Sequence, residues 1–123
     1  MPTRTELAPS HPIVVLMTFP TSEEAGRIAS ILVQERLVAC VNIVPQVRSL
    51  FIWDGTLQDV AEVLAVAKTT VASLESVVHR VKSLHTYTVP EVIGIPILGG
   101  SDAYLDWVKT AVSGINSATD STS

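Results

Sequence analysis

The chain has few of the residues that mark specialised classes of protein. It contains one cysteine, and eight Lys and Arg against twelve Asp and Glu, among 123 residues. A single cysteine excludes an internal disulfide and is typical of a protein kept in a reducing compartment. The net charge is −4 and the basic residues form no cluster, so the sequence has no electrostatic footprint for nucleic acid. We therefore expect no nucleic-acid partner.

Long apolar runs are also missing, although 47% of the residues are hydrophobic. No stretch reaches the roughly 18 consecutive apolar residues of a membrane span. The first twelve residues, MPTRTELAPSHP, are polar and lack the apolar core of a signal peptide. These absences predict a cytoplasmic protein with no membrane partner.

The dominant feature is residues 39–70, which read as two long β-strands joined at Asp54-Gly55. Asp-Gly between two β-rich runs is a strong hairpin signal, because both central residues of a type I′ turn need positive φ. With a two-residue loop, Cys40 and Asn42 fall on one face of the hairpin. On the other face the predicted pairs are Trp53 with Thr56, Phe51 with Gln58, Val47 with Glu62, Ile43 with Val66 and Val41 with Lys68.

This hairpin is too long for the domain that carries it. Its first strand, residues 39–53, would extend roughly 50 Å, whereas a compact chain of this size is about 35 Å across. An overhanging ribbon with an apolar tip, residues 50–53, exposes hydrophobic surface and unpaired strand edges. We therefore predict a homo-oligomer. The alternative is a shorter hairpin broken at Pro45, which marks a bulge or an edge.

The remaining elements complete a recognisable order. Strands are expected over residues 13–18 and 92–98. Three helices are expected: one over residues 21–37, a second that ends at residue 84, and a third that begins after Ser101. The order is strand, helix, strand, strand, helix, strand, helix. It predicts an α+β protein, a ferredoxin-like βαββαβ sandwich with an extended central hairpin and an extra C-terminal helix. We assign residues 13–114 to this domain, residues 1–12 to a flexible N-terminal arm and residues 115–123 to a disordered tail.

Few polar residues could carry chemistry. Cys40 lies between apolar neighbours and reads either as an inert buried thiol or as a soft ligand for copper. Glu62 and Lys68 lie on one strand face but about 20 Å apart, so they cannot pair within the strand. A buried Glu62 would need a partner from elsewhere. Two interpretations of Lys68 are equally consistent with the sequence: it binds an anionic ligand, or it lies in solvent at the end of its strand.

The segment from His85 to Glu91 brings an imidazole, the Tyr87 phenol and a carboxylate into one loop before a strand. Such loops often hold sites. His85 could equally serve a helix C-terminus, where it would interact with the free carbonyl groups. No glycine elbow, oxyanion motif or phosphate-binding loop accompanies these residues, and we do not expect an enzyme.

Several segments together resemble the CutA family of divalent-ion tolerance proteins. They cover most of the chain from Val14 to Val108 and read ACVNI (39–43), WDG (53–55), EVL (62–64), KT (68–69), HTYTVPE (85–91) and YLDW (104–107). The family's loop often reads His-Pro-Tyr-Glu, whereas this chain has Thr86 and Thr88. That departure predicts a less rigid loop with one carboxylate fewer.

The resemblance implies a homotrimer built from long strands, with similarity to PII signalling proteins and a role in copper and divalent-metal tolerance. It implies metal ligands at Cys40, His85 and Glu91. The ligand cleft between subunits would contain Lys68, Tyr87, Pro90, Trp53 and Trp107. We expect weak binding of copper or another divalent cation, with no cofactor required for folding. The alternative is a PII-like regulator that binds a small anion in the cleft.

Overall fold

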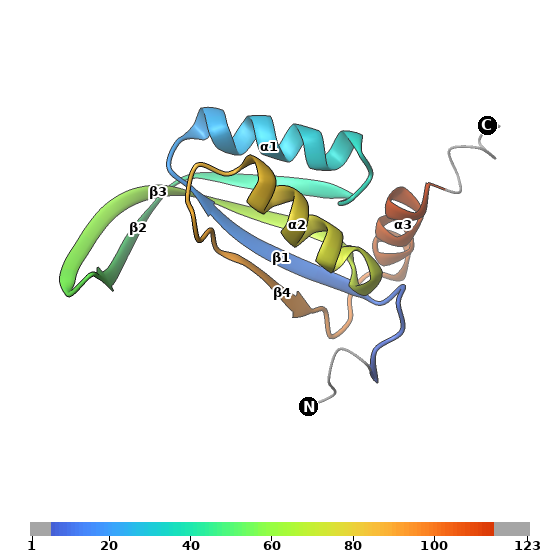
Figure 1. The fold of residues 1–123 in the computed structure, drawn as a ribbon. Coiled ribbons are helices and arrows are strands. Elements are labelled where there is room, and N and C mark those ends of the chain that lie inside the picture. The colour runs from blue at the N-terminus through green and yellow to red at the C-terminus, as the bar shows by residue number, and fades with distance from the viewer. Residues whose placement is uncertain (1–5, 115–123) are drawn as a thin grey trace.

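The computed structural model describes residues 6–114 and has the predicted element order (Figure 1). Four strands form one antiparallel sheet in the order β2-β3-β1-β4. Helices α1 and α2 cover one face, so the ferredoxin-like α+β architecture is confirmed, with α3 as the extra helix. The elements are β1 (Pro12–Phe19), α1 (Ser22–Gln34), β2 (Cys40–Trp53), β3 (Thr56–Thr70), η2 (Val71–Ser73), α2 (Leu74–Leu84), β4 (Val92–Pro96) and α3 (Asp102–Ser113).

The core lies between the sheet and helices α1 and α2. Side chains alternate between the two faces of a strand, and every second residue of β1, and of β3 from Val63 onward, is buried under the helices. Apolar stripes at helical spacing on α1 and α2 close the layer. The fully buried apolar side chains in it include Val15, Met17, Phe19, Ala65, Ala67, Ile28, Leu32, Val77 and Val81.

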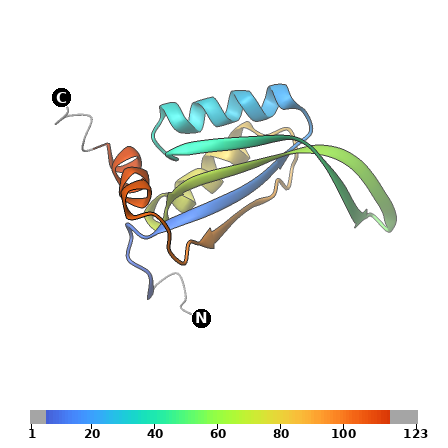
Figure 2. The ribbon, with the colours of Figure 1, turned by 180° about the vertical axis from the view of Figure 1, so that it is seen from behind.

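The hairpin turn has the expected chemistry. Asp54 and Gly55 have φ angles of 51° and 76°, which is the left-handed pair that a type I′ turn requires. Trp53 pairs with Thr56, as predicted. The far half of the hairpin projects beyond the layered body of the chain (Figures 1 and 2). Its exposed apolar side chains are Leu50, Phe51, Ile52, Trp53 and Leu57.

The register of the hairpin changes at a β-bulge between Val44 and Val47. On the turn side of the bulge the predicted pairs hold. On the other side the register of β2 against β3 is shifted by one residue from the predicted one. The predictions that Ile43 faces Val66 and that Val41 faces Lys68 are therefore wrong. The residue opposite Lys68 is Cys40. Pro45 lies in the bulge on an edge strand, where its missing N–H costs no ladder hydrogen bond, and the strand continues through it unbroken.

Some boundaries also differ from the expectation. Helix α1 ends at Gln34 rather than near residue 37, and Arg36 has a left-handed φ of 60°. Residues 8–12 of the predicted arm are held by main-chain hydrogen bonds: Ala72 N donates to Pro9 O and Val71 N donates to His11 O. These residues are therefore part of the folded domain. Residues 1–5 of the arm and the predicted tail, residues 115–123, lie outside the described residues.

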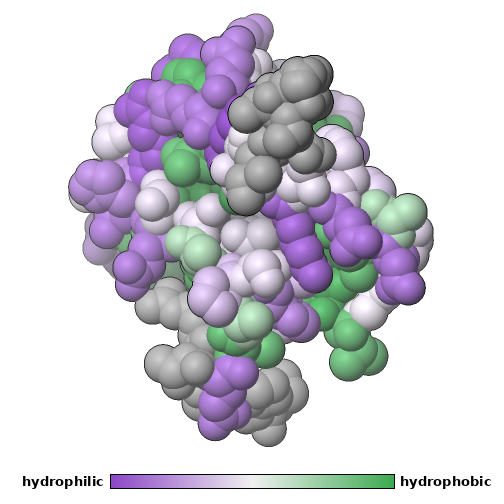
Figure 3. All heavy atoms as spheres, turned by 90° about the vertical axis from the view of Figure 1, so that its right-hand side faces the viewer, coloured by the Kyte–Doolittle hydropathy of each residue, from purple (hydrophilic) through white to green (hydrophobic). Residues whose placement is uncertain are grey.

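The face of the sheet that α1 and α2 leave open, called here the outer face, is largely apolar. Helix α3 contacts β1 and β3 and stands at one end of the molecule; Figure 3 looks onto that end, where hydrophobic patches emerge between hydrophilic residues. The strand residues of the outer face are Val14, Leu16, Val44, Leu64, Val66, Ile93 and Ile95, and none of them is fully buried. No helix within residues 6–114 is long and apolar enough to cross a membrane.

Candidate functional site

His85 occupies the C-terminal end of α2, and its side chain lies in the core. The imidazole is fully buried and stacks on Phe19, with ring centroids 4.9 Å apart. Its Nδ1 accepts the N–H of Tyr87 at 2.9 Å, so the ring proton sits on Nε2 and is donated to Thr18 O at 2.8 Å. Both ring nitrogens are therefore engaged in hydrogen bonds within the chain.

Glu24 fixes the loop that follows His85. The carboxylate is buried, and it accepts hydrogen bonds from Thr86 N at 2.9 Å and Thr86 Oγ1 at 2.5 Å. Burial acts to raise the pKa of Glu24, but the hydrogen bonds from Thr86 and the nearby His85 and Arg27 outweigh it and lower the pKa. Thr86 therefore anchors the loop to α1, a contact that the expectation of a less rigid loop did not include.

Tyr87 connects the same loop to the hairpin. Its hydroxyl donates to Glu62 Oε2 at 2.7 Å, and Glu62 is only 8% exposed. Burial, together with the hydrogen bond to Glu62 and the negative charges of Glu62 and Glu24, raises the pKa of Tyr87 to about 12. The phenol therefore stays protonated and acts as a donor at neutral pH.

A second polar group lies at the α3 end of the outer face. Cys40 Sγ is 3.4 Å from the hydroxyl of Tyr104, and that ring packs at 5.6 Å against Trp107. The hydrogen bond with Cys40, followed by burial, raises the pKa of Tyr104. Beside Cys40, the Lys68 amine donates to Asn42 Oδ1. Cys40 is a free cysteine and is partly exposed.

These two groups do not meet within one chain. Cys40 lies opposite Lys68, which pairs with Val14, whereas His85 binds Thr18. Val14 and Thr18 are four positions apart on β1, a distance of about 13 Å. Among residues 6–114 no cluster of three or more His, Cys, Asp or Glu could hold a metal ion.

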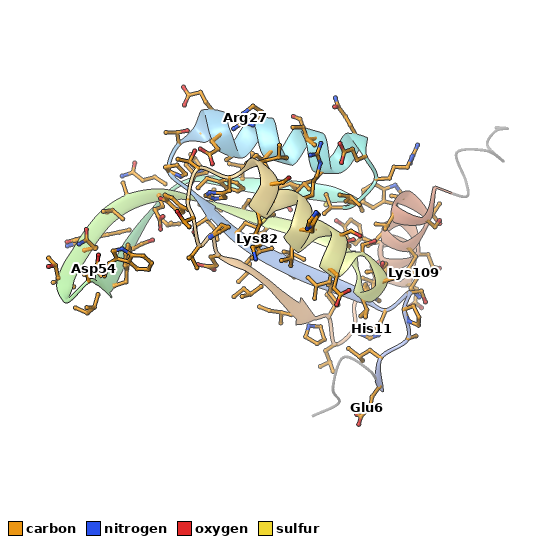
Figure 4. The ribbon with its side chains drawn as sticks, viewed as in Figure 1. Glu6, His11, Arg27, Asp54, Lys82 and Lys109 are labelled. Atoms are coloured by element: carbon orange, nitrogen blue, oxygen red, sulfur yellow. The ribbon has the colours of Figure 1, made fainter. Side chains whose placement is uncertain are left out.

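The other residues of the predicted cleft are also spread out. Trp53 lies beside Asp54 at the hairpin tip, whereas Trp107 is on α3 near Lys109 at the opposite end (Figure 4). Pro90 is half-buried and Glu91 is exposed at the entry to β4. A cleft containing all the predicted residues would therefore need more than one chain.

Sequence reasoning missed Glu24 as a member of the loop network. The pattern Thr21-Ser-Glu-Glu24 predicts a capping box, in which the acidic side chain returns to the start of its own helix. The Thr21 hydroxyl does accept a hydrogen bond from Glu24 N at 3.1 Å. The carboxylate of Glu24, however, is used by Thr86, a residue 62 positions away. No local signal marks such a contact.

Comparison with known proteins agrees with this architecture. A family model described as "CutA1 divalent ion tolerance protein" matches residues 13–111. The chain belongs to the CutA1 family. The resemblance seen in the sequence is thereby confirmed. The family description names tolerance of divalent ions and no catalysed reaction.

Individual CutA1 relatives match over most of the domain. The divalent-cation tolerance protein CutA of Thermus thermophilus is 48% identical over 96 residues, which are 78% of this chain and 93% of that protein. Protein CutA, chloroplastic, of Arabidopsis thaliana is 46% identical over 80% of this chain. The chain spans 54% of the length of that plant relative.

Solved CutA1 structures have the same fold. The Thermus thermophilus structure superposes with a TM-score of 0.77 at 47% identity, covering 79% of this chain and 94% of the other. CutA1 from Oryza sativa gives a TM-score of 0.80 at 44% identity, covering 82% and 93%. The structure described as the periplasmic divalent cation tolerance protein CutA from Archaeoglobus fulgidus gives 0.80 at 37% identity, covering 82% and 98%.

These names correct one expectation. The sequence predicted a cytoplasmic protein, but one CutA1 relative is named chloroplastic and another periplasmic. Proteins of this family therefore occur in more than one compartment. The prediction of a cytoplasmic location is wrong, because membership of the family does not imply it. The fold of a CutA1 protein does not indicate the compartment in which the protein is located.

The PII-like alternative gains no support from the CutA1 geometry. An anion placed beside Tyr87 would meet the carboxylate of Glu62, and like charges at close range repel. Lys68, the cation expected to bind such an anion, already donates to Asn42.

Proposed function

We propose that this chain supports tolerance of divalent metal ions by binding them weakly, copper among them, at sites completed between subunits of a homotrimer. The observation that carries the proposal is the partly exposed thiol of Cys40 in a chain of the divalent-ion tolerance family. A thiolate is a soft ligand that selects copper(I) and other thiophilic ions. Binding at an exposed thiol is expected to be weak, because one ligand does not enclose an ion.

The separation of the candidate ligands favours a site shared between chains. Cys40 and His85 lie at opposite ends of one sheet. The overhanging hairpin and the apolar outer face both favour self-association. In a trimer, Cys40 of one subunit would meet Glu91 or the His85 loop of its neighbour. His85 would have to give up its hydrogen bond with Tyr87 N or Thr18 O to bind an ion, so we rank Cys40 and Glu91 before it.

Calorimetric titration with copper and zinc tests the proposal. The wild-type protein is compared with Cys40→Ala, with Glu91→Gln and with the control His79→Ala, which removes an exposed imidazole on α2 away from both groups. We expect Cys40→Ala to abolish or strongly weaken copper binding, Glu91→Gln to weaken it, and His79→Ala to leave it unchanged. Identical isotherms for wild type and Cys40→Ala would contradict the proposal.

A further inference from the structure

The turn of the hairpin joins a free carboxylate directly to a glycine. Asp54 and Gly55 are both exposed, and Figure 4 shows Asp54 at the far end of the hairpin, away from the layered body of the chain. Within residues 6–114 no hydrogen bond or ion pair holds the Asp54 carboxylate. This side chain can therefore turn toward the main chain that follows it.

Gly55 places an unhindered main-chain nitrogen beside that carboxylate. Glycine has no side chain, and even a Cβ built at this position would meet nothing within 4 Å. The last pair of the ladder is Trp53 with Thr56, and no acceptor among the described residues binds the Gly55 N–H. The carboxyl carbon of Asp54 and the nitrogen of Gly55 are thus adjacent in the chain, and no other group packs against them.

We propose that Asp54 is a site of spontaneous isomerisation to isoaspartate. The Gly55 nitrogen attacks Cγ of the protonated Asp54 carboxyl group. A Cγ–N bond forms, the amide proton and the carboxyl hydroxyl leave as one water, and the product is a five-membered succinimide ring. Water then opens the ring at either carbonyl. Opening at Cγ restores aspartate, whereas opening at the main-chain carbonyl routes the chain through Cγ and frees an α-carboxylate.

The other aspartates among residues 6–114 lack this combination. Asp59 is held by two hydrogen bonds from Arg48, at 2.8 Å and 2.7 Å, and it precedes the β-branched Val60. Asp102 and Asp106 lie in α3, where the regular helix restrains the main-chain rotation that ring closure requires. The hairpin turn is therefore the site that the structure selects within the described part of the chain.

The conformation of the turn controls the rate of this reaction. The φ angles of 51° and 76° place both residues in the left-handed region, and ring closure requires rotation about the Cα–C bond of Asp54 out of that turn. The rotation opens the tip but moves no core side chain, because residues 50–57 are all exposed or half-buried. Exposed segments of this kind open at low cost in free energy. We therefore expect slow isomerisation in the folded protein.

Isomerisation would change the hairpin tip without changing the mass of the chain, because one water leaves and one enters. The main chain gains a methylene group inside a two-residue loop, and the type I′ turn that joins Trp53 to Thr56 accommodates two ordinary residues only. The last pair of the ladder is then expected to separate. This proposal concerns the turn alone, and it depends neither on metal binding nor on assembly.

Protease mapping of aged protein provides the first test. The full-length protein is incubated for several weeks at neutral pH and physiological temperature, then denatured and digested with trypsin, which releases residues 49–68 as one peptide. Endoproteinase Asp-N cuts before aspartate but not before isoaspartate. We expect cleavage before Asp54 to decline with time and cleavage before Asp59 to stay complete. No decline at Asp54, or an equal decline at both positions, would overturn the proposal.

Methyl transfer by a protein-isoaspartate methyltransferase provides a second readout, since it labels the freed α-carboxylate in the purified 49–68 peptide. Asp54→Glu is the matched control, because it keeps the charge but would have to close a six-membered ring, and the label should be lost. Asp54→Asn suits the same left-handed turn and reaches the same succinimide by expelling ammonia, so it should gain label faster than the wild type. Labelling of Asp54→Glu at the wild-type rate, or none in Asp54→Asn, would contradict the assigned chemistry.

Discussion

The hydroxyl of Tyr87 and the carboxylate of Glu62 are joined by a 2.7 Å hydrogen bond, which ties the loop between α2 and β4 to the root of the hairpin. The Tyr87 ring also lies 4.8 Å from His85, which is itself anchored to β1. One phenol therefore links the core to the element that projects from it.

Tyr87→Phe should remove the donor without changing the shape of the ring. We expect the free energy of unfolding to fall by about 1–3 kcal/mol, because a buried carboxylate loses its hydrogen-bond partner. Urea denaturation at fixed protein concentration measures the change. Tyr104→Phe, on an exposed ring, is the control and should change stability by less than about 0.5 kcal/mol. Equal effects of the two substitutions would show that the Tyr87 hydrogen bond contributes nothing.

The Glu24–Thr86 contact predicts a dependence of stability on pH. The folded-state pKa of Glu24 lies below its usual 4.5, so its ionised form stabilises the fold above that pH. The contribution is lost as the pH falls through the lowered pKa. Thr86→Val removes the hydroxyl donor and should cost about 1–3 kcal/mol near neutral pH.

The difference between wild type and Thr86→Val should then shrink below pH 4.5, because protonated Glu24 no longer gains from the lost donor. Thermal unfolding across this range measures it. Thr86→Ser keeps the hydroxyl and should follow the wild type. A gap between wild type and Thr86→Val that stays constant with pH would refute the role assigned to Glu24.

Gly94 on β4 faces α2 at close range. A Cβ at this position would lie 3.1 Å from both terminal methyl groups of Leu74 and 3.5 Å from Ile13 Cδ1. Those methyl groups can move, so we expect Gly94→Ala to cost about 1 kcal/mol. Gly26→Ala is the matched control: nothing lies within 4 Å of its Cβ, and a glycine-to-alanine change inside α1 should stabilise by about 0.5–1 kcal/mol. Chemical denaturation that gives the same sign for both would contradict this.

Trp53 should report on assembly through its fluorescence. It is 57% exposed in the single chain, and a tip that docks on another subunit would lose contact with water. In a Trp107→Phe variant, where Trp53 is the remaining tryptophan, dilution below the dissociation point should move emission to longer wavelength. A Trp53→Phe variant, which reports on Trp107, provides the comparison. Constant emission from Trp53 through dissociation would mean that the tip stays in water.

Local patterns predicted the elements well, because each has a local physical cause. Asp54-Gly55 specified the turn, and Ser101 capped α3 by accepting from Tyr104 N. The register beyond Pro45 could not be derived in the same way. A proline indicates an irregularity in the strand but not how many extra residues the irregularity contains. A difference of one residue decides whether Cys40 or Val41 faces Lys68.

The candidate site was less predictable than the fold. The sequence identified His85 and Tyr87 as a loop with polar chemistry, but both partners of His85 are main-chain groups, Thr18 O and Tyr87 N. Every residue type has a main-chain carbonyl and all but proline have a main-chain N–H, so no sequence pattern indicates these contacts. The metal ligands Cys40, His85 and Glu91 remain a prediction.

The bulge at Pro45 and Gln46 has a consequence for how relatives should be aligned. One extra residue reverses the inward–outward alternation, so β2 consists of two half-strands whose hydrophobic patterns are out of phase. An alignment scored as a single strand will favour a false match in one half. In a homologue that lacks the extra residue, a one-residue gap belongs at this point, and its equivalent of Cys40 then stays opposite the equivalent of Lys68 on the outer face.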